Sequence, residues 1–389
     1  MDFIVVAFCM VFIPSAVAQS LMGLDEKATF ATLAPIILVV SMFSNRLLVH
    51  KTIPFLVFIL MLLGIIASSV ALSFSQFLMS FTLGIAVVVG HQLFATLGKP
   101  RVLRAVTWFA LALLIGGVVG IAYAASGGQP LFEIRVGYRT TYLYLTTFSF
   151  AHIGGIIRPS GIFDEPGSLA MFVAIVTMFN DTLRQNQKLN ALLVVLVIFT
   201  GALAGIVLAI LYTVSSNAMK SKRKKGVVYI STLLIAYLIL SVSAPQNIVT
   251  TTFETFYSNR LQVVDGRLAG DNRSNQVFEF FTIVDDEILL RGTNNSTQTY
   301  VTEDQSSNPF SITYGYGLLI SLPYFGLLLW LAVITVRNRF HNSYTSLGLL
   351  LLLLQRPYIY HMSWSILIAS VIWLLYHTSR NVRFRRVKR

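Results

Sequence analysis

The sequence has few of the residues from which metal and redox sites are built. Only one of its 389 residues is a cysteine, Cys9, so the chain by itself can form neither a disulfide nor a thiolate metal site. The six histidines include no HxxxH or HExxH pair, the spacing that presents two imidazoles on one helix face. We therefore expect neither a metal nor a cofactor.

Charge is scarce as well, at 12% of residues, whereas 55% are hydrophobic. Apolar runs of about 17–25 residues recur along the chain, the length that a helix needs to cross roughly 30 Å of hydrocarbon. They show no alternation of apolar and polar residues, so they predict helices rather than strands of a barrel. The sequence thus predicts an all-α polytopic membrane protein with about 12 transmembrane helices.

The predicted spans cover residues 3–20, 28–43, 53–72, 75–97, 105–125, 167–179, 190–200, 203–218, 227–243, 312–336, 343–354 and 359–377. Residues 16–19 resemble a signal-peptidase site, but Asp2 replaces the usual positive start, so we interpret the first run as an uncleaved span. One integral membrane domain, residues 1–377, is then followed by a basic tail, residues 378–389.

The net charge of +13 comes from basic clusters in the loops that lie on the side of the two termini. Twenty of the 29 basic residues fall there, which makes that side cytoplasmic by the positive-inside rule. The clusters account for the charge as membrane orientation and contact with anionic lipid, so we expect no nucleic-acid partner. Eight of the nine remaining basic residues are arginine, which grips phosphate through paired hydrogen bonds, so the outer side favours an anionic ligand.

One step of this topology has an alternative. The apolar run from Asn190 to Val214 could form one helix, but a single crossing would move the basic clusters outside, so we divide it near residues 200–205 into a helical hairpin. Alternatively, residues 142–157 form an extra span, which would place the segment 158–166 in the cytoplasm.

Two long outer loops follow from the preferred topology, residues 126–166 and 244–308. The second, between the ninth and tenth spans, is the only large polar excursion, and loops of this length are usually functional. Within it, residues 258–273 and 276–290 have the pattern of helices.

The polar segment from Arg158 to Pro166 is the best candidate for chemistry in so apolar a chain. Asp164 and Glu165 come just before a predicted helix, whose N-terminal dipole favours anions. They could therefore cap that helix and pair with Arg158, a structural role that is compatible with a chemical one.

The segment also carries a resemblance. An arginine, then Gly161-Ile162-Phe163-Asp164-Glu165-Pro166 opening an apolar helix, and then a pair of short helices resemble the Wzy-type polymerases of bacterial surface polysaccharides, in the O-antigen polymerase and ligase superfamily. The late loop is similar too, with Gly266-Arg267 and an end near Tyr314-Gly315-Tyr316-Gly317. The resemblance covers roughly residues 130–377 in layout.

The resemblance implies an enzyme of the bacterial inner membrane that acts on oligosaccharides linked to undecaprenyl diphosphate at the outer leaflet, with membrane lipid and a chain-length regulator as further partners. It implies that the growing glycan is transferred to the next lipid-linked repeat without a metal, and it places residues 158–166 outside. Glu165 is then the expected proton acceptor, with Asp164 second. The expected diphosphate-binding residues are Arg158, Arg260, Arg267, Arg273 and Arg291.

Two departures from the family pattern bear on this expectation. The late loop contains no histidine, which the ligases carry there, so transfer of glycan to a lipid A-core acceptor is the weaker alternative. At the hairpin tip, this chain has Ala202-Leu203 where many relatives have Ser-Arg, so a phosphate contact there must come from another residue or be absent. A transporter is a further alternative, but the predicted spans lack the central charged residues that transport usually requires.

Overall fold

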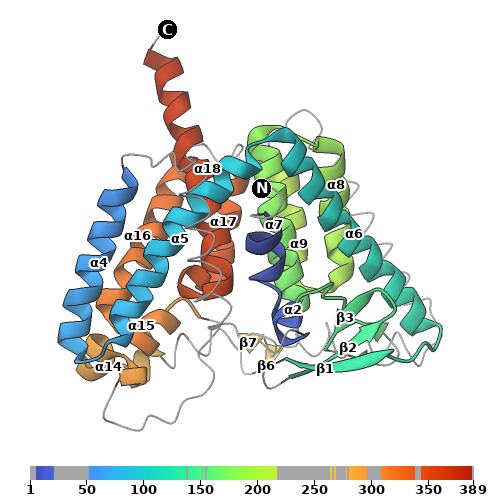
Figure 1. Cartoon of the computed structure of the whole chain (residues 1–389), viewed down its shortest axis with the longest axis horizontal. Coiled ribbons are helices and arrows are strands. Elements are labelled where there is room, and N and C mark those ends of the chain that lie inside the picture. The colour runs from blue at the N-terminus through green and yellow to red at the C-terminus, as the bar shows by residue number, and fades with distance from the viewer. Residues whose placement is uncertain are drawn as a thin grey trace.

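The computed structural model describes residues 6–21, 52–136, 139–150, 152–153, 156–216, 263–264, 267–268, 277, 280–295, 308–337 and 343–387. These residues are mostly helical, and five helices are long and apolar enough to cross a membrane (Figure 1). The predicted spans 28–43 and 227–243 lie outside the described residues. Arg260 and Arg273 of the late loop also lie outside them.

The five long helices are α4 (Thr52–Ala71), α5 (Ser75–Leu97), α6 (Pro100–Ala125), α7 (Pro166–Leu183) and α16 (Leu318–Arg337). Shorter apolar helices are α8 (Gln187–Leu196), continued by the 3-10 helix η2 (Val197–Thr200), then α9 (Leu203–Ser215) and α17 (Tyr344–Gln355). The chain closes with η5 (Tyr358–Tyr360) and α18 (Met362–Val387). These bounds agree with the predicted spans to within a few residues at most places.

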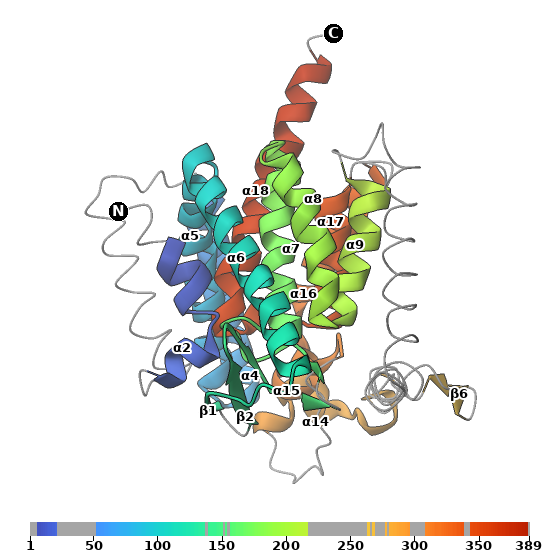
Figure 2. The same ribbon diagram turned by 90° about the vertical axis from the view of Figure 1, so that its right-hand side faces the viewer.

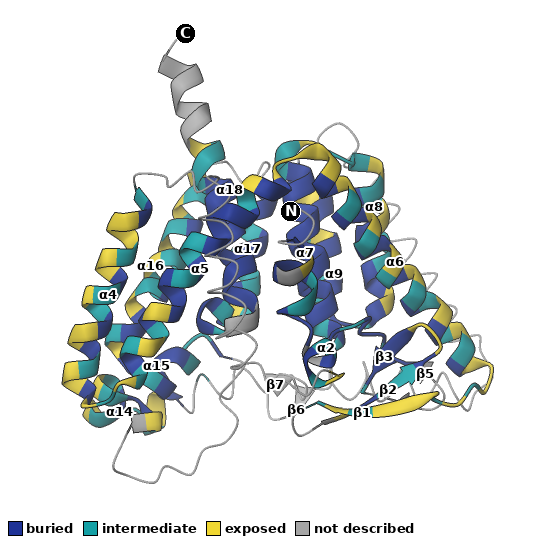
Figure 3. Ribbon diagram, viewed as in Figure 1, coloured by how far each residue is buried: buried dark blue, intermediate teal, exposed yellow. Residues whose placement is uncertain are grey.

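Helix α7 forms the centre of the bundle. It packs against α6, α8, α9, α17 and α18, and 15 of its 18 residues are buried (Figure 3). Pro166 begins the helix, where its missing N–H costs no hydrogen bond. In contrast, α4 lies at the edge and exposes large side chains such as Phe55 and Phe58, as expected for a helix that faces lipid. The residues just before α7 are therefore placed in the middle of one end of the bundle.

The predicted hairpin is confirmed. The helical run ends at Thr200, Gly201 takes a left-handed backbone conformation at φ +63°, and α9 begins at Leu203 (Figure 2). Glycine adopts this conformation without the steric penalty that a Cβ brings. The two arms pack closely, since a Cβ on Gly205 would lie 2.8 Å from the carbonyl oxygen of Val197.

Residues 126–166 contain β-structure that the all-α prediction lacks. Strands β1 (Phe132–Val136), β2 (Arg139–Tyr144) and β3 (Thr147–Ser149) form an antiparallel sheet in that order, and β4 (His152–Ile153) pairs with β5 (Ile156–Ile157). The alternative of an extra helical span at 142–157 is therefore wrong, because strands β2, β3, β4 and β5 lie in this stretch.

Three further elements differ from the prediction. The first run is divided into the π-helical segment η1 (Ala7–Phe12) and α2 (Ala16–Leu21), because Pro14 interrupts it and the Ser15 hydroxyl accepts a hydrogen bond from Ala18 N at 3.1 Å. The run 312–336 is divided at Gly317 into α15 (Ser311–Tyr316) and α16. Helix α18 continues through residues 378–387, which the sequence had assigned to a tail.

The late loop is helical only in part. Residues 263–264 and 267–268 form the strands β6 and β7, so the helix predicted at 258–273 is wrong there. The helix predicted at 276–290 is interrupted at Val284-Asp285, since the Asp285 carboxylate accepts a hydrogen bond from Ile288 N at 2.8 Å and starts α14 (Asp286–Arg291). Strands β1–β3, α14 and α15 lie at one end of the bundle, which we call the strand end, and the C-terminus lies at the other, the tail end (Figures 1 and 2).

Candidate functional site

The segment that precedes α7 is fixed by its contacts with β3. Phe148 N donates to Gly161 O at 2.9 Å, and the Ser160 hydroxyl donates to Phe148 O at 2.8 Å. Two residues after Gly161, Phe163 is fully buried, and the centre of its ring lies 5.3 Å from that of Phe172 and 6.0 Å from that of Trp364. This anchoring sets the position of the two carboxylates that follow.

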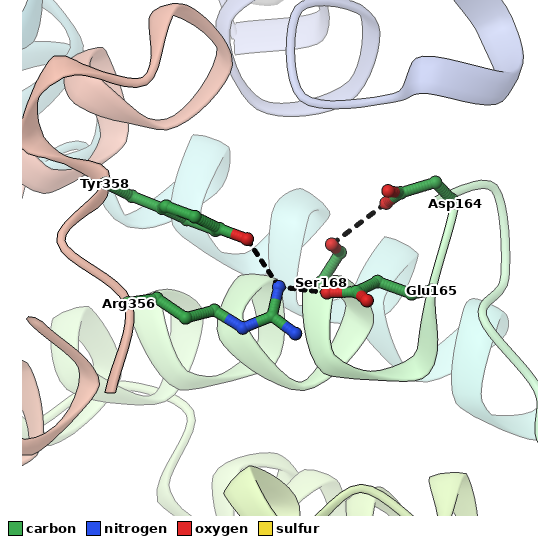
Figure 4. A network of polar contacts seen from close by, with 5 residues as sticks. All are labelled: Asp164, Glu165, Ser168, Arg356 and Tyr358. Carbon is green, nitrogen blue, oxygen red and sulfur yellow. Dashed lines mark hydrogen bonds and ion pairs between the residues drawn. The ribbon is translucent and has the colours of Figure 1, made fainter. Parts of the chain in front are cut away.

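Asp164 lies in a half-buried position. Its Oδ1 accepts a hydrogen bond from the Ser168 hydroxyl at 3.0 Å (Figure 4). Burial, and then the neighbouring charge of Glu165, raise the pKa of Asp164, while the bond from Ser168 and the charge of Arg356 lower it by less. The net effect favours the neutral carboxylic acid more than at an exposed aspartate.

Glu165 forms an ion pair with Arg356, which follows directly after α17 (Figure 4). It occupies the N-cap position of α7, but its side chain makes no capping hydrogen bond. The pair joins the start of α7 to the segment between α17 and α18. Of the two structural roles considered for the carboxylates, capping by the Glu165 side chain is therefore wrong, and its ion-pair partner is Arg356.

Arg356 is held from a second side by Tyr358. Its Nη1 donates to the Tyr358 hydroxyl at 2.5 Å, and the guanidinium carbon lies 5.4 Å from the centre of that ring (Figure 4). Close approach to α7 depends on Gly167, where a Cβ would lie 2.9 Å from Arg356 Nη2. The guanidinium thus rests against the first turn of α7.

Arg158 lies at the tip of the helical hairpin. Its Nη2 donates to the carbonyl oxygen of Gly201 at 2.9 Å, and Nε lies 3.4 Å from the position of a Cβ on Gly201. A guanidinium is therefore present at the tip, although Ala202-Leu203 itself supplies none.

Of the other predicted site residues, Arg291 is the one whose side chain lies within the described part of the structure. Arg291 ends α14, which packs against α4, α15 and α16, and its carbonyl oxygen accepts a hydrogen bond from Gln76 at 3.1 Å. Arg267 lies on β7, and its side chain is outside the described part of the structure. Arg260 and Arg273, as noted, also lie outside it.

Sequence reasoning did not select Arg356 or Tyr358. A signal was present, because Arg356 is one of the eight arginines on the predicted outer side and stands with Pro357 in a short gap between two apolar runs. Nothing in the local sequence tied it to Glu165, which lies far away along the chain. The pairing depends on how α7, α17 and α18 pack.

The cluster offers an anionic carboxylate, a carboxylic acid held closer to neutrality, and guanidinium groups that can bind phosphate. This combination suits proton transfer next to a phosphorylated ligand. Among the residues that the structure describes, no group of three or more His, Cys, Asp or Glu side chains could hold a metal ion.

Comparison of the chain with protein-family models, curated proteins and solved structures gives no match.

Proposed function

We propose that this protein is a membrane polymerase that joins oligosaccharide repeats carried on undecaprenyl diphosphate at the outer leaflet. The observation that supports this most is the cluster of Asp164, Glu165 and Arg356 at the centre of one end of an apolar bundle. A lipid-linked diphosphate would present its charge at such an end while its chain stays in the hydrocarbon. The resemblance of residues 158–166 to the Wzy-type motif points in the same direction.

The distribution of charge supports an outward-facing site. Helices α6 and α8 begin, and α7 and α16 end, at the tail end, where the basic residues include Lys99, Arg101, Arg104, Arg184, Lys188 and Arg337. By the positive-inside rule this end is cytoplasmic, and both termini lie there in the proposed topology. The strand end, which carries the cluster, then faces outward.

The proposed reaction requires one bond to form and one to break. The sugar hydroxyl of the next repeat attacks the anomeric carbon of the growing chain, and the bond from that carbon to the diphosphate oxygen breaks. The electron pair leaves with undecaprenyl diphosphate, whose charge the guanidinium groups of Arg158 and Arg356 stabilise. The hydroxyl proton passes to Glu165. The raised pKa of Asp164 favours its neutral form, which limits the negative charge beside the diphosphate.

Lipid-linked glycans from a deletion strain complemented with variants test this proposal. We expect Glu165→Gln to lower polymer formation at least about a hundredfold, as loss of a general base does, and to accumulate single lipid-linked repeats. Glu133→Gln, which changes an exposed acid on β1 at the same end, should restore normal polymer.

The same extracts separate the alternatives. A ligase would accumulate long lipid-linked chains when it is lost, and a transporter would leave single repeats on the inner leaflet. Either pattern, or full polymer yield with Glu165→Gln, would contradict the proposal.

A further inference from the structure

The Glu165–Arg356 ion pair has the geometry of a contact that can exchange partners. The carboxylate and the Tyr358 hydroxyl both bind Nη1 of Arg356, whereas a guanidinium carries five N–H donors in a planar fork. Planar forks of this kind bind phosphate through two parallel hydrogen bonds. An arriving phosphate would therefore compete with Glu165 for the same cation.

The pair is also accessible. The Arg356 side chain is 20% exposed and the Glu165 side chain 15% exposed, so neither is sealed in the bundle. Tyr358 and the first turn of α7 would hold the guanidinium in place if the carboxylate moved away. Arg356 thus has contacts other than Glu165, as a site that changes ligands requires.

We infer that this ion pair is a switch opened by the diphosphate of the lipid-linked donor, which replaces Glu165 on Arg356 and releases the carboxylate as proton acceptor. The inference rests on the proposed function and adds Arg356 to the diphosphate-binding residues. A bound guanidinium favours the charged form of a carboxylate, so Glu165 accepts a proton less readily while the pair is closed.

The switch would link proton transfer to the presence of the donor. Without donor, Glu165 stays bound and does not activate a hydroxyl group or water. With donor bound, the guanidinium stabilises the diphosphate, and Glu165 faces the acceptor hydroxyl. One ion pair would thereby set the order in which the two chemical roles become available.

Binding of inorganic diphosphate to the purified full-length protein tests the switch directly. Titration calorimetry in a neutral maltoside detergent at pH 8 and fixed salt would compare the wild type with single variants. Because Glu165→Gln removes a competing charge but keeps an oxygen that can accept from Arg356, we expect it to bind diphosphate roughly three- to tenfold more tightly. Arg356→Gln should weaken binding by roughly tenfold or more.

Two further variants guard against trivial explanations. Glu165→Asp keeps the negative charge but shortens the side chain, so tighter binding there would show that the contact matters rather than the charge alone. Glu133→Gln, at an exposed acid of the same end, should bind as the wild type does. Gel filtration establishes that each variant is folded, and if Glu165→Gln is not, Glu165→Asp decides. Glu165 variants that bind diphosphate no more tightly than the wild type would overturn the switch.

The source of the anion and the underlying function are tested separately. In nanodiscs, the ratio of the diphosphate affinities of the wild type and Arg356→Gln should be the same with phosphatidylcholine as with phosphatidylglycerol, because an anionic bilayer repels diphosphate from both proteins equally. A ratio that falls to one with phosphatidylglycerol would assign Arg356 to lipid headgroups and contradict the inference. If Glu165→Gln tightens diphosphate binding yet supports normal polymer in cells, the proposed function and the role of Glu165 as proton acceptor fail, and the exchange of Glu165 for diphosphate on Arg356 stands. If Glu165→Gln abolishes polymer but leaves the diphosphate affinity unchanged, the proposed function stands and the switch fails.

Discussion

At the scale of single residues, Asp164 and Glu165 show how neighbouring carboxylates acquire different properties. Both are half-buried, but Glu165 is paired with a guanidinium, whereas Asp164 accepts a hydrogen bond from a hydroxyl. The sequence located both residues, and the family resemblance put Glu165 before Asp164, but the contacts that distinguish them, with Arg356 and Ser168, were not predicted. Ser168 lies one helical turn away and could have been anticipated, but Arg356 required the packing of three helices.

The half-buried Asp164 predicts a pH dependence of stability. Its pKa is raised in the folded protein, so the native state holds the proton more tightly than the unfolded chain. The resulting stability is complete below the unfolded pKa, about 4, and is lost as the pH rises through the folded pKa. Asp164→Asn cannot ionise, so its melting temperature should fall less than that of the wild type between acidic and neutral pH.

Thermal unfolding of the detergent-solubilised protein across this pH range measures the effect. Asp164→Ala serves as the control, since it also removes the ionisation but loses the acceptor for Ser168. It should therefore share the flatter pH dependence at a lower overall stability. Equal pH dependence in the wild type and Asp164→Asn would show that Asp164 does not contribute.

At the scale of elements, the chain shows which features sequence patterns can predict. Long apolar runs between basic clusters located most helices, and the need to keep those clusters on one side led to the hairpin turn near residue 201. The strands of residues 132–157 were missed because they are only two to six residues long and pair with one another, so no apolar period identifies them. The break at Val284-Asp285 was missed because one capping side chain overrides an apolar helical pattern.

The contact between α5 and α18 predicts a site that is intolerant of larger side chains. A Cβ on Gly90 would lie 2.6 Å from the Cβ of Ala369 and 3.0 Å from backbone atoms of Ile366 and Ser370. Since backbone cannot rotate away, Gly90→Ala should lower the free energy of unfolding by about 1–3 kcal/mol.

The matched control is Gly326→Ala on α16, where an added Cβ meets no atom within 4 Å. We expect no destabilisation there and a gain of at most about 1 kcal/mol from helix propensity. Melting temperatures of the two variants make the comparison. Equal effects at both positions would mean that helices α5 and α18 separate easily at this contact.

At the scale of the whole molecule, the two ends of the bundle differ in charge. The tail end is basic, whereas the strand end mixes Glu133, Asp164, Glu165, Asp286 and Glu287 with arginines. This asymmetry was predicted from the sequence once the apolar runs had been assigned as spans. The structure shows in addition that the carboxylate of Glu165 and the guanidinium of Arg356 lie together at the strand end.

The proposed orientation predicts which residues a membrane-impermeant maleimide reaches. The single native cysteine, Cys9, is buried and can be removed by Cys9→Ala. In that background, Glu133→Cys should react in intact spheroplasts, whereas Lys188→Cys, exposed at the tail end, should react only after permeabilisation. Labelling by mass shift of the purified protein measures both, and the reverse pattern would place the site in the cytoplasm.

The hairpin has one more consequence, which concerns membrane thickness. Its first arm, residues 187–200, has 14 residues and would reach only about 20 Å at 1.5 Å per residue, whereas the hydrocarbon layer measures about 30 Å. The tip, with the Arg158 guanidinium bound to Gly201, would then end well below the outer surface. Beside it the bilayer must thin or admit water, so a lipid-borne diphosphate could sink to the protein while its polyprenyl chain stays in place.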